Sequence, residues 1–326
     1  SWIILDGGHN NNYVSASQKY AIRPVIMLHP GVPITGGQGT PNEPYTLGEA
    51  PLTASQYLIK NKLSSDINTS PTNGLFAIDN QGELTTSTSP REYRYIGANP
   101  DNYIQFNNEL WRIIGIFEGQ LKIIRKDLLE NKTWDHGGTT NWNDKPMQKY
   151  FNGEYLEGMD ESSQNKIADY TWKLGGSSTW GDVTAQMFYE LERGSLTSTG
   201  DSTEWTGKIA LMYPSDYGFS TSGGSTTNRS SCLAKVLYNW YSVEDCYTNS
   251  WLYDSSNHQW TLTPFVYGRT RAPSIGAPLS YILYKGGNVY LIDEFSSYSA
   301  RPTLYLLPTV EIASGTGTNT DPYILK

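Results

Sequence analysis

A segment near the end of this chain is also present, in diverged form, near its beginning. Residues 23–47 read RPVIMLHPGVPITGGQGTPNEPYTL and residues 301–325 read RPTLYLLPTVEIASGTGTNTDPYIL, at an offset of 278 positions, and 12 of the 25 positions are identical. Such self-similarity marks an internal repeat. It predicts that residues 1–49 are the C-terminal β segment of a preceding repeat, acting as a connector or donor, and that residues 50–326 are a whole second module.

The composition favours a secreted or surface protein over a cytosolic enzyme. Charged residues make up only 17% of the chain and aromatic residues 13%, which is typical of a loop-rich domain that uses amphipathic rings in its core and on its surface. The net charge of −8 repels a phosphate backbone, so we expect no nucleic-acid partner. No apolar run reaches the roughly 20 residues that a membrane helix needs, so we expect no membrane span in this chain.

The beginning of the chain permits two interpretations. No signal peptide opens it, so we expect Ser1 to be an internal position of a longer precursor. The alternative is a proteolytic or cloning boundary that cut inside the preceding module. An isolated 49-residue piece with strand edges exposes unpaired backbone groups, so we expect it to pair with its own module or with the next subunit of a filament.

Two cysteines, Cys232 and Cys246, lie 14 positions apart. We expect them to form a disulfide, which would indicate an oxidising, extracytoplasmic setting. The alternatives are two buried free thiols or a metal site, but no second Cys or His pair has ligand spacing. We therefore predict no metal and no cofactor.

The pattern of apolar residues predicts an α+β domain in which a dense run of strands precedes several capped helices. Strands are expected at 2–5, 25–28, 75–78, 93–96, 103–106, 110–117, 121–125, 208–213, 251–253, 260–264, 281–284 and 289–292, with a terminal hairpin. Those from 93 to 125 form an antiparallel meander. Thr53 and Gln56 predict a capping box for a helix over 54–63. Asp144 and Asp182 are expected to be N-caps, with Pro146 in a first turn and Gly194 ending the third helix, and a further helix is expected over 161–174.

Several longer motifs resemble a large family of bacterial surface proteins. They are YIGANPDNY at 95–103, ELWRIIG at 109–115, GKIALMYPSDYG at 207–218, NSWL at 249–252 and RPTLYL at 301–306. The domain of that family is similar to the C-type-lectin-like superfamily, which also contains the formylglycine-generating enzymes. The resemblance covers residues 53–326, and its tail pattern also covers residues 20–47. It implies a C-type-lectin-like module with flanking helices and long loops on the bacterial cell surface.

The resemblance implies two chemistries that the residues do not clearly support. Formylglycine-generating enzymes bind copper through a cysteine pair, but the surroundings of Cys232 and Cys246 have no counterpart of that active site. In calcium-dependent lectins a Trp-Asn-Asp triplet supplies oxygen ligands to the ion. Trp142, Asn143 and Asp144 match its letters but lead into a proline-containing helix start, so helix capping competes with calcium binding there.

Candidate contact residues lie in the loops. Asp216 and Tyr217 follow a strand and could line a recognition surface. Loop tryptophans such as Trp142, Trp251 and Trp260 could stack on a sugar ring or anchor a protein, but core packing is the favoured role for each of them. Arg23 and Arg301 occupy equivalent positions before the repeated strands. We expect them to brace loops through several hydrogen bonds, with direct ligand contact as the alternative.

Two function classes compete. The first is a non-enzymatic extracellular module of a surface protein or filament, which binds other copies of itself, other surface proteins or glycans and polymerises through its N-terminal segment. The second is an oxidase related to the formylglycine-generating enzymes, or a hydrolase, for which no residue set assembles. Tyr213-Pro-Ser-Asp216 lacks the glycine-flanked elbow that exposes a nucleophilic serine. The repeat favours the first class, because the repeated part is β-hairpin scaffold.

Overall fold

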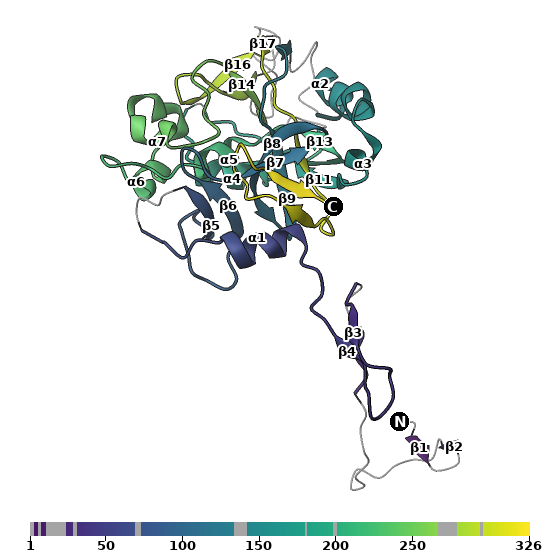
Figure 1. Cartoon of the computed structure of the whole chain (residues 1–326). Helices are drawn as coiled ribbons and strands as arrows, with labels where there is room; N and C mark the ends of the chain where they lie inside the picture. Colours follow the sequence, from purple (N-terminus) through teal and green to yellow (C-terminus); the bar gives the residue numbers. More distant parts are fainter. Residues whose placement is uncertain are drawn as a thin grey trace. The chain divides into compact units, whose positions relative to one another are not determined.

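The computed structural model describes residues 3–5, 8–10, 24–28, 31–68, 73–133, 142–179, 181–197, 201–266, 279–293 and 296–326. The chain divides into two compact units, residues 1–51 and residues 52–326 (Figure 1). Each unit is described by itself.

The second unit combines short helices with many short strands, so the α+β class is confirmed. Its α-helices are α1 (Ala54–Lys62), α2 (Pro146–Tyr150), α3 (Glu161–Gln164), α4 (Ala185–Glu192), α5 (Pro214–Phe219), α6 (Arg229–Leu233) and α7 (Glu244–Thr248). Short helices of other types are the 3-10 helices η1 (Trp142–Asp144) and η3 (Leu237–Ser242) and the π-helix η2 (Phe151–Tyr155).

The strands of the second unit follow in chain order. They are β5 (Gly74–Ile78), β6 (Glu92–Ile96), β7 (Tyr103–Phe106), β8 (Glu109–Phe117), β9 (Gln120–Arg125), β10 (Lys132–Thr133), β11 (Tyr170–Lys173), β12 (Glu204–Gly207), β13 (Ile209–Ala210), β14 (Gln259–Phe265), β15 (Leu279–Leu283), β16 (Val289–Asp293), β17 (Ser297–Tyr298), β18 (Thr303–Tyr305), β19 (Ile312–Ser314) and β20 (Tyr323–Leu325).

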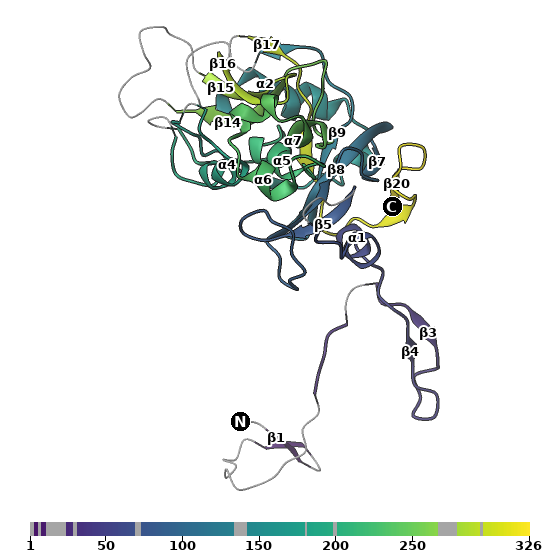
Figure 2. The same ribbon diagram turned by 90° about the vertical axis from the view of Figure 1, so that its left-hand side faces the viewer.

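In the described part of the chain, the main sheet has nine strands. Seven of them follow in the order β13-β18-β9-β8-β7-β20-β19. The other two are β6, which pairs with the C-terminal end of β8, and β5, which pairs with β6. β7, β8 and β9 are antiparallel neighbours, as the predicted meander requires. β6 and β7 follow one another along the same edge of β8, where Arg94 pairs with Gly115 and Tyr103 with Arg112. A three-stranded sheet, β14-β15-β16, lies at the end of the unit away from α1 and β5 (Figures 1 and 2).

The last 25 residues border the meander on both sides. β18 lies between β9 and β13, and β20 lies parallel to β7, with Tyr323 opposite Ile104. All other pairings within the main sheet are antiparallel, so β20 makes the sheet mixed. Leu304 and Tyr323 are fully buried here. The sheet is therefore completed by the segment that the sequence repeats.

Local capping signals were predicted with mixed success. Thr53 caps α1 and forms the expected capping box with Gln56. Asp144 is not an N-cap, because it is the last residue of η1 and the N-cap of α2 is Lys145. Pro146 lies in the first turn of α2, as predicted. Asp182 is not an N-cap either, since the hydroxyl of Thr184 accepts the Met187 amide at 3.2 Å and caps α4.

Two predicted elements are wrong. The helix expected over 161–174 ends after one turn, because residues 170–173 form β11 and pair with β12. Trp172 is buried and Thr171 is exposed there, which is the period of two that a strand gives. The strand expected at 251–253 is a turn, which the Trp251 amide fixes by donating to the carbonyl of Gly97 at 2.9 Å.

Among its described residues, the first unit contains two antiparallel hairpins, β1 (Ile3–Leu5) with β2 (Gly8–Asn10), and β3 (Ile34–Gly36) with β4 (Thr46–Leu47). Residues 25–28, predicted as a strand, pair with no strand among the described residues. Arg23 lies outside the described residues.

Candidate functional site

The structure buries all the side chains that the sequence suggested for ligand contact. Their exposed fractions are 1% for Trp142, 1% for Asp216, 0% for Tyr217, 5% for Trp251 and 1% for Trp260. The exposed contact surface suggested for these five is therefore wrong, whereas core packing, the favoured role of the three tryptophans, describes their position.

The polar ends of three of these rings, those of Trp251, Trp260 and Tyr217, form hydrogen bonds inside the fold. The indole N–H of Trp251 donates to the carbonyl of Tyr95 at 2.9 Å, and that of Trp260 donates to the carbonyl of Lys132 at 2.7 Å. The hydroxyl of Tyr217 donates to the carbonyl of Gly287 at 2.8 Å. A buried ring needs such a partner, because an unpaired N–H or O–H in the core is costly.

Asp216 is the centre of a buried charge network. Its carboxylate accepts hydrogen bonds from Arg94 Nη1 at 2.9 Å, from Lys122 Nζ at 2.5 Å and from the amide of Tyr213 at 2.9 Å. Burial by itself raises the pKa of Asp216, but the ion pairs with Lys122 and Arg94 outweigh it and hold the pKa below its usual value. The network fixes the start of α5 to β6 and β9.

A second buried carboxylate lies beside this network. Glu192, at the end of α4, accepts the amide of Ser215 at 3.0 Å and its hydroxyl at 2.5 Å, and Arg193 Nη1 lies 3.2 Å away. Burial raises the pKa of Glu192 to about 7. The Ser215 contacts join α4 to α5, so both carboxylates serve to hold helices in place.

Arg301 is buried, and the described residues give its side chain one hydrogen bond to a loop rather than the several that were expected. Its Nη2 donates to the carbonyl of Leu252 at 3.0 Å, and burial, followed by the charge of Arg112, lowers its pKa to about 10. The contact fixes the turn that carries Trp251.

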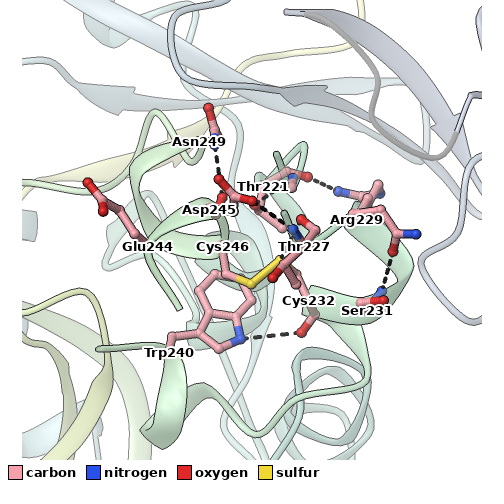
Figure 3. Close-up of a disulfide and its surroundings, with 12 residues drawn as sticks. Thr221, Thr227, Arg229, Ser231, Cys232, Trp240, Glu244, Asp245, Cys246 and Asn249 are labelled. Carbon is pink, nitrogen blue, oxygen red and sulfur yellow. Dashed lines mark hydrogen bonds between the residues drawn. A yellow bond between two sulfur atoms is a disulfide. The ribbon is translucent and has the colours of Figure 1, made fainter. Parts of the chain in front are cut away.

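The predicted disulfide between Cys232 and Cys246 is present, and both residues are fully buried. It joins α6 to α7, and Trp240 of η3 lies beside it with its indole N–H donating to the carbonyl of Cys232 at 3.3 Å (Figure 3). Asp245, next to Cys246, accepts from the amides of Thr226 and Thr227, each at 2.7 Å, and from the Thr226 hydroxyl at 2.6 Å. The loop between the cysteines is therefore fixed at both ends and at its middle.

That loop presents tyrosines to solvent. η3 turns Trp240 into the core, whereas Tyr241 is 58% exposed and Tyr238 is partly exposed. The ring of Tyr238 lies 6.5 Å from that of Tyr241, centroid to centroid, and stacks on Tyr290 of β16 at 5.7 Å. The disulfide loop and the three-stranded sheet thus meet through aromatic rings.

The series of rings continues across the end of that sheet. Tyr290 is 6.0 Å from Tyr284, Tyr284 stacks on His258 at 4.1 Å, and His258 meets Tyr298 edge-on at 5.2 Å. Tyr284 is 38% exposed, and the other three are partly exposed. We name these six residues the aromatic strip: Tyr241, Tyr238, Tyr290, Tyr284, His258 and Tyr298.

His258 is held in one orientation within the strip. Its Nδ1 accepts the amide of Lys285 at 3.0 Å, which places the ring proton on Nε2. Burial, followed by the nearby charge of Lys285, lowers the pKa of His258, so the ring is neutral near pH 7. A neutral imidazole stacked on Tyr284 adds a flat, polar-edged surface to the strip.

Sequence reasoning did not find the strip. It singled out tryptophans, which fill the core, and left the tyrosines of residues 238–298 aside. The number of tyrosines in that stretch could have indicated the strip, because tyrosine combines an apolar ring with a hydroxyl that can stay hydrated at the surface. Their alignment depends on the pairing of β15 with β16 and on the disulfide.

Comparison of the chain with protein-family models, with curated proteins and with solved structures finds no match. Among the described residues, no group of three or more His, Cys, Asp or Glu side chains is arranged to hold a metal ion. In the same residues, no helix has the length and apolarity needed to span a membrane.

Proposed function

We propose that this chain is a non-enzymatic extracellular module of a bacterial surface protein, and that it binds a protein or glycan partner through the aromatic strip. The observation that carries the proposal is the strip itself, in which Tyr241 and Tyr284 expose large rings beside four partly exposed ones. Tyrosine is over-represented at binding hot spots, because it contributes a large rigid area and a hydrogen-bonding hydroxyl at a small entropic cost.

The disulfide supports both the proposed extracellular location and the proposed binding function of the aromatic strip. Disulfides persist in oxidising, extracytoplasmic environments. This one closes the loop that carries Tyr238 and Tyr241, so it restrains the rings before a partner arrives. A preordered surface loses less conformational entropy on binding.

The finer fold proposal is a C-type-lectin-like module, a class whose loops carry its binding surfaces. It rests on the motifs at 95–103, 109–115 and 207–218, which lie in or beside the main sheet. The competing role, copper-dependent oxidation, would use Cys232 and Cys246 as free thiolates. Their disulfide favours the structural role of the two sulfurs.

The test is binding of the full chain to an array of glycans and to a panel of purified extracellular proteins. We expect saturable binding that Tyr241→Ala and Tyr284→Ala each weaken about tenfold, the effect of losing a hot-spot ring. The matched control is Met187→Ala, which removes a large apolar side chain of similar exposure, 40%, outside the strip and should leave the affinity unchanged.

Near-UV circular dichroism must show that the strip variants keep the wild-type fold. Binding that persists in Tyr241→Ala and Tyr284→Ala, or that falls equally in Met187→Ala, contradicts the proposal.

A further inference from the structure

The repeated sequence forms the same hairpin in both units. Across β3 and β4, Ile34 pairs with Leu47 and Gly36 with Thr46. Across β19 and β20, Ile312 pairs with Leu325 and Ser314 with Ile324. Adding the offset of 278 converts the first register into the second, including the irregularity between the two pairs. The hairpin is therefore encoded within the segment itself.

The turns of the two hairpins agree in detail. Gly37 has a φ of +80° and Gly315 a φ of +94°, a region that L residues with side chains rarely adopt. A Cβ at Gly37 would lie 2.0 Å from the carbonyl oxygen of Pro44, and a Cβ at Gly315 would lie 2.1 Å from that of Pro322. These prolines are equivalent positions of the repeat, so the close backbone approach is also repeated.

The surroundings of the two copies differ. We call residues 302–325 the closing segment, because they complete the main sheet. β18 of this segment fills the space between β9 and β13, and β20 lies along β7. We call this set of positions the closing slot. The exposed fractions of Thr303, Leu304, Tyr305 and Leu306 in the slot are 0%, 0%, 1% and 0%.

The equivalent positions of the first unit are exposed. Val25, Ile26, Met27 and Leu28 correspond to 303–306, and their exposed fractions are 91%, 79%, 96% and 53%. Tyr45 corresponds to the fully buried Tyr323 and is 56% exposed. Removing apolar side chains from water is favourable, so we expect this row of residues to pack against a matching apolar surface.

We propose that residues 24–47 are the closing segment of a second module of this same fold. In that module, residues 25–27 take the position of β18, between the counterparts of β9 and β13. β4 takes the position of β20, parallel to the counterpart of β7. The surface of residues 24–47 is thus an interaction surface whose partner has the same slot as residues 52–326. This inference goes beyond the binding function and does not depend on it.

The structure also selects the partner. A second copy of this chain offers no open slot, because its own residues 303–306 fill the position with almost no exposed surface. Within residues 52–326 the closing segment comes last in the chain order. The partner is therefore a module that precedes residues 24–47 in the polypeptide, and the short connection from Leu47 to α1 joins two consecutive modules.

The test uses an exchange chain, the full chain with residues 301–325 replaced by the sequence of residues 23–47. We expect one cooperative thermal transition and the near-UV circular dichroism of the wild type, with a lowered Tm. The Tm falls because Met in place of Tyr305 loses a ring stacked on Tyr170 at 3.6 Å. A second exchange chain that keeps Tyr305 should recover part of the lost Tm.

Leu304→Asp in the otherwise native chain is the control for a blocked slot, since a buried unpaired carboxylate prevents β18 from docking. It should lose the cooperative transition. If both exchange chains behave like Leu304→Asp, residues 24–47 do not fit the slot and the inference is overturned.

Sedimentation velocity of the full chain checks the choice of partner. A monomer across the micromolar range is expected. Self-association that Ile26→Asp abolishes would identify a second copy of the chain as the partner and would overturn the assignment to a preceding module.

Discussion

The carboxylate of Asp216 lies 2.9 Å from the guanidinium Nη1 of Arg94, and both side chains are only 1% exposed although 122 positions separate them in the chain. Lys122 of β9 completes the group from the other side of the carboxylate. A buried charge is strongly destabilising once its partner is removed. Because Asp216 lies in α5 and its partners lie in β6 and β9, the position of α5 on the main sheet depends on this one carboxylate.

Replacing Asp216 should therefore be costly. Asp216→Asn leaves Lys122 buried without a carboxylate and leaves Arg94 paired with Glu92 alone, and we expect a loss of about 3–5 kcal/mol in the free energy of unfolding. Asp127→Asn is the control, because its ion pair with Lys126 is largely exposed and should contribute less than about 1 kcal/mol. Urea denaturation measures both, and equal small losses would show that the network does not stabilise the fold.

Glu192 should make stability depend on pH. Its carboxyl has a pKa of about 7 in the folded chain against 4.5 for an ordinary glutamate. Between these values the unfolded chain releases the proton and the folded chain keeps it, so stability falls as pH rises from about 4.5 to 7, by roughly 3 kcal/mol in all.

Glu192→Gln removes this dependence. We expect the difference in unfolding free energy between the wild type and Glu192→Gln to change in the variant's favour as pH rises through that window. Denaturation at pH 5 and pH 8 measures the difference. A constant difference would show that Glu192 is ionised in the folded chain at both values.

The disulfide should stabilise the second unit and the strip. Closing a loop of 14 positions contributes about 3 kcal/mol through the unfolded chain. The double variant Cys232→Ala, Cys246→Ala should lose about this amount under oxidising conditions, and adding a reductant should destabilise the wild type but not the variant. Mass spectrometry must confirm that the reductant has converted the disulfide of the wild type to free thiols. If the stability of the wild type is then unchanged, the expectation is wrong.

The two equivalent glycines should respond differently to the same change. Gly315→Ala forces a Cβ against the carbonyl of Pro322 inside the completed sheet, and we expect a loss of about 1–3 kcal/mol. Gly37→Ala strains the same turn in the first unit and should leave the thermal transition of residues 52–326 unchanged. Equal effects on that transition would mean that the hairpin of the first unit also stabilises the second unit.

Local signals in the sequence determined local structure. The capping box of Thr53 and Gln56 and the strands from 74 to 125 depend on neighbouring residues, so their pattern was sufficient. The caps of α2 and α4 were placed wrongly because Asp, Thr and Pro near a helix start compete for the role within a few positions. Residues 170–173 became a strand because β12 was available to pair with them.

Composition, residue spacing and self-comparison were sufficient to predict the α+β class, the disulfide and the repeat. They could not predict which aromatic rings are buried, because an indole or phenol suits the core and the surface alike and its place depends on distant segments that pack on it. The same holds for the repeat. Its hairpin forms wherever the segment occurs, but burial of its apolar side chains requires the strands of a complete module, which residues 52–326 supply to one copy.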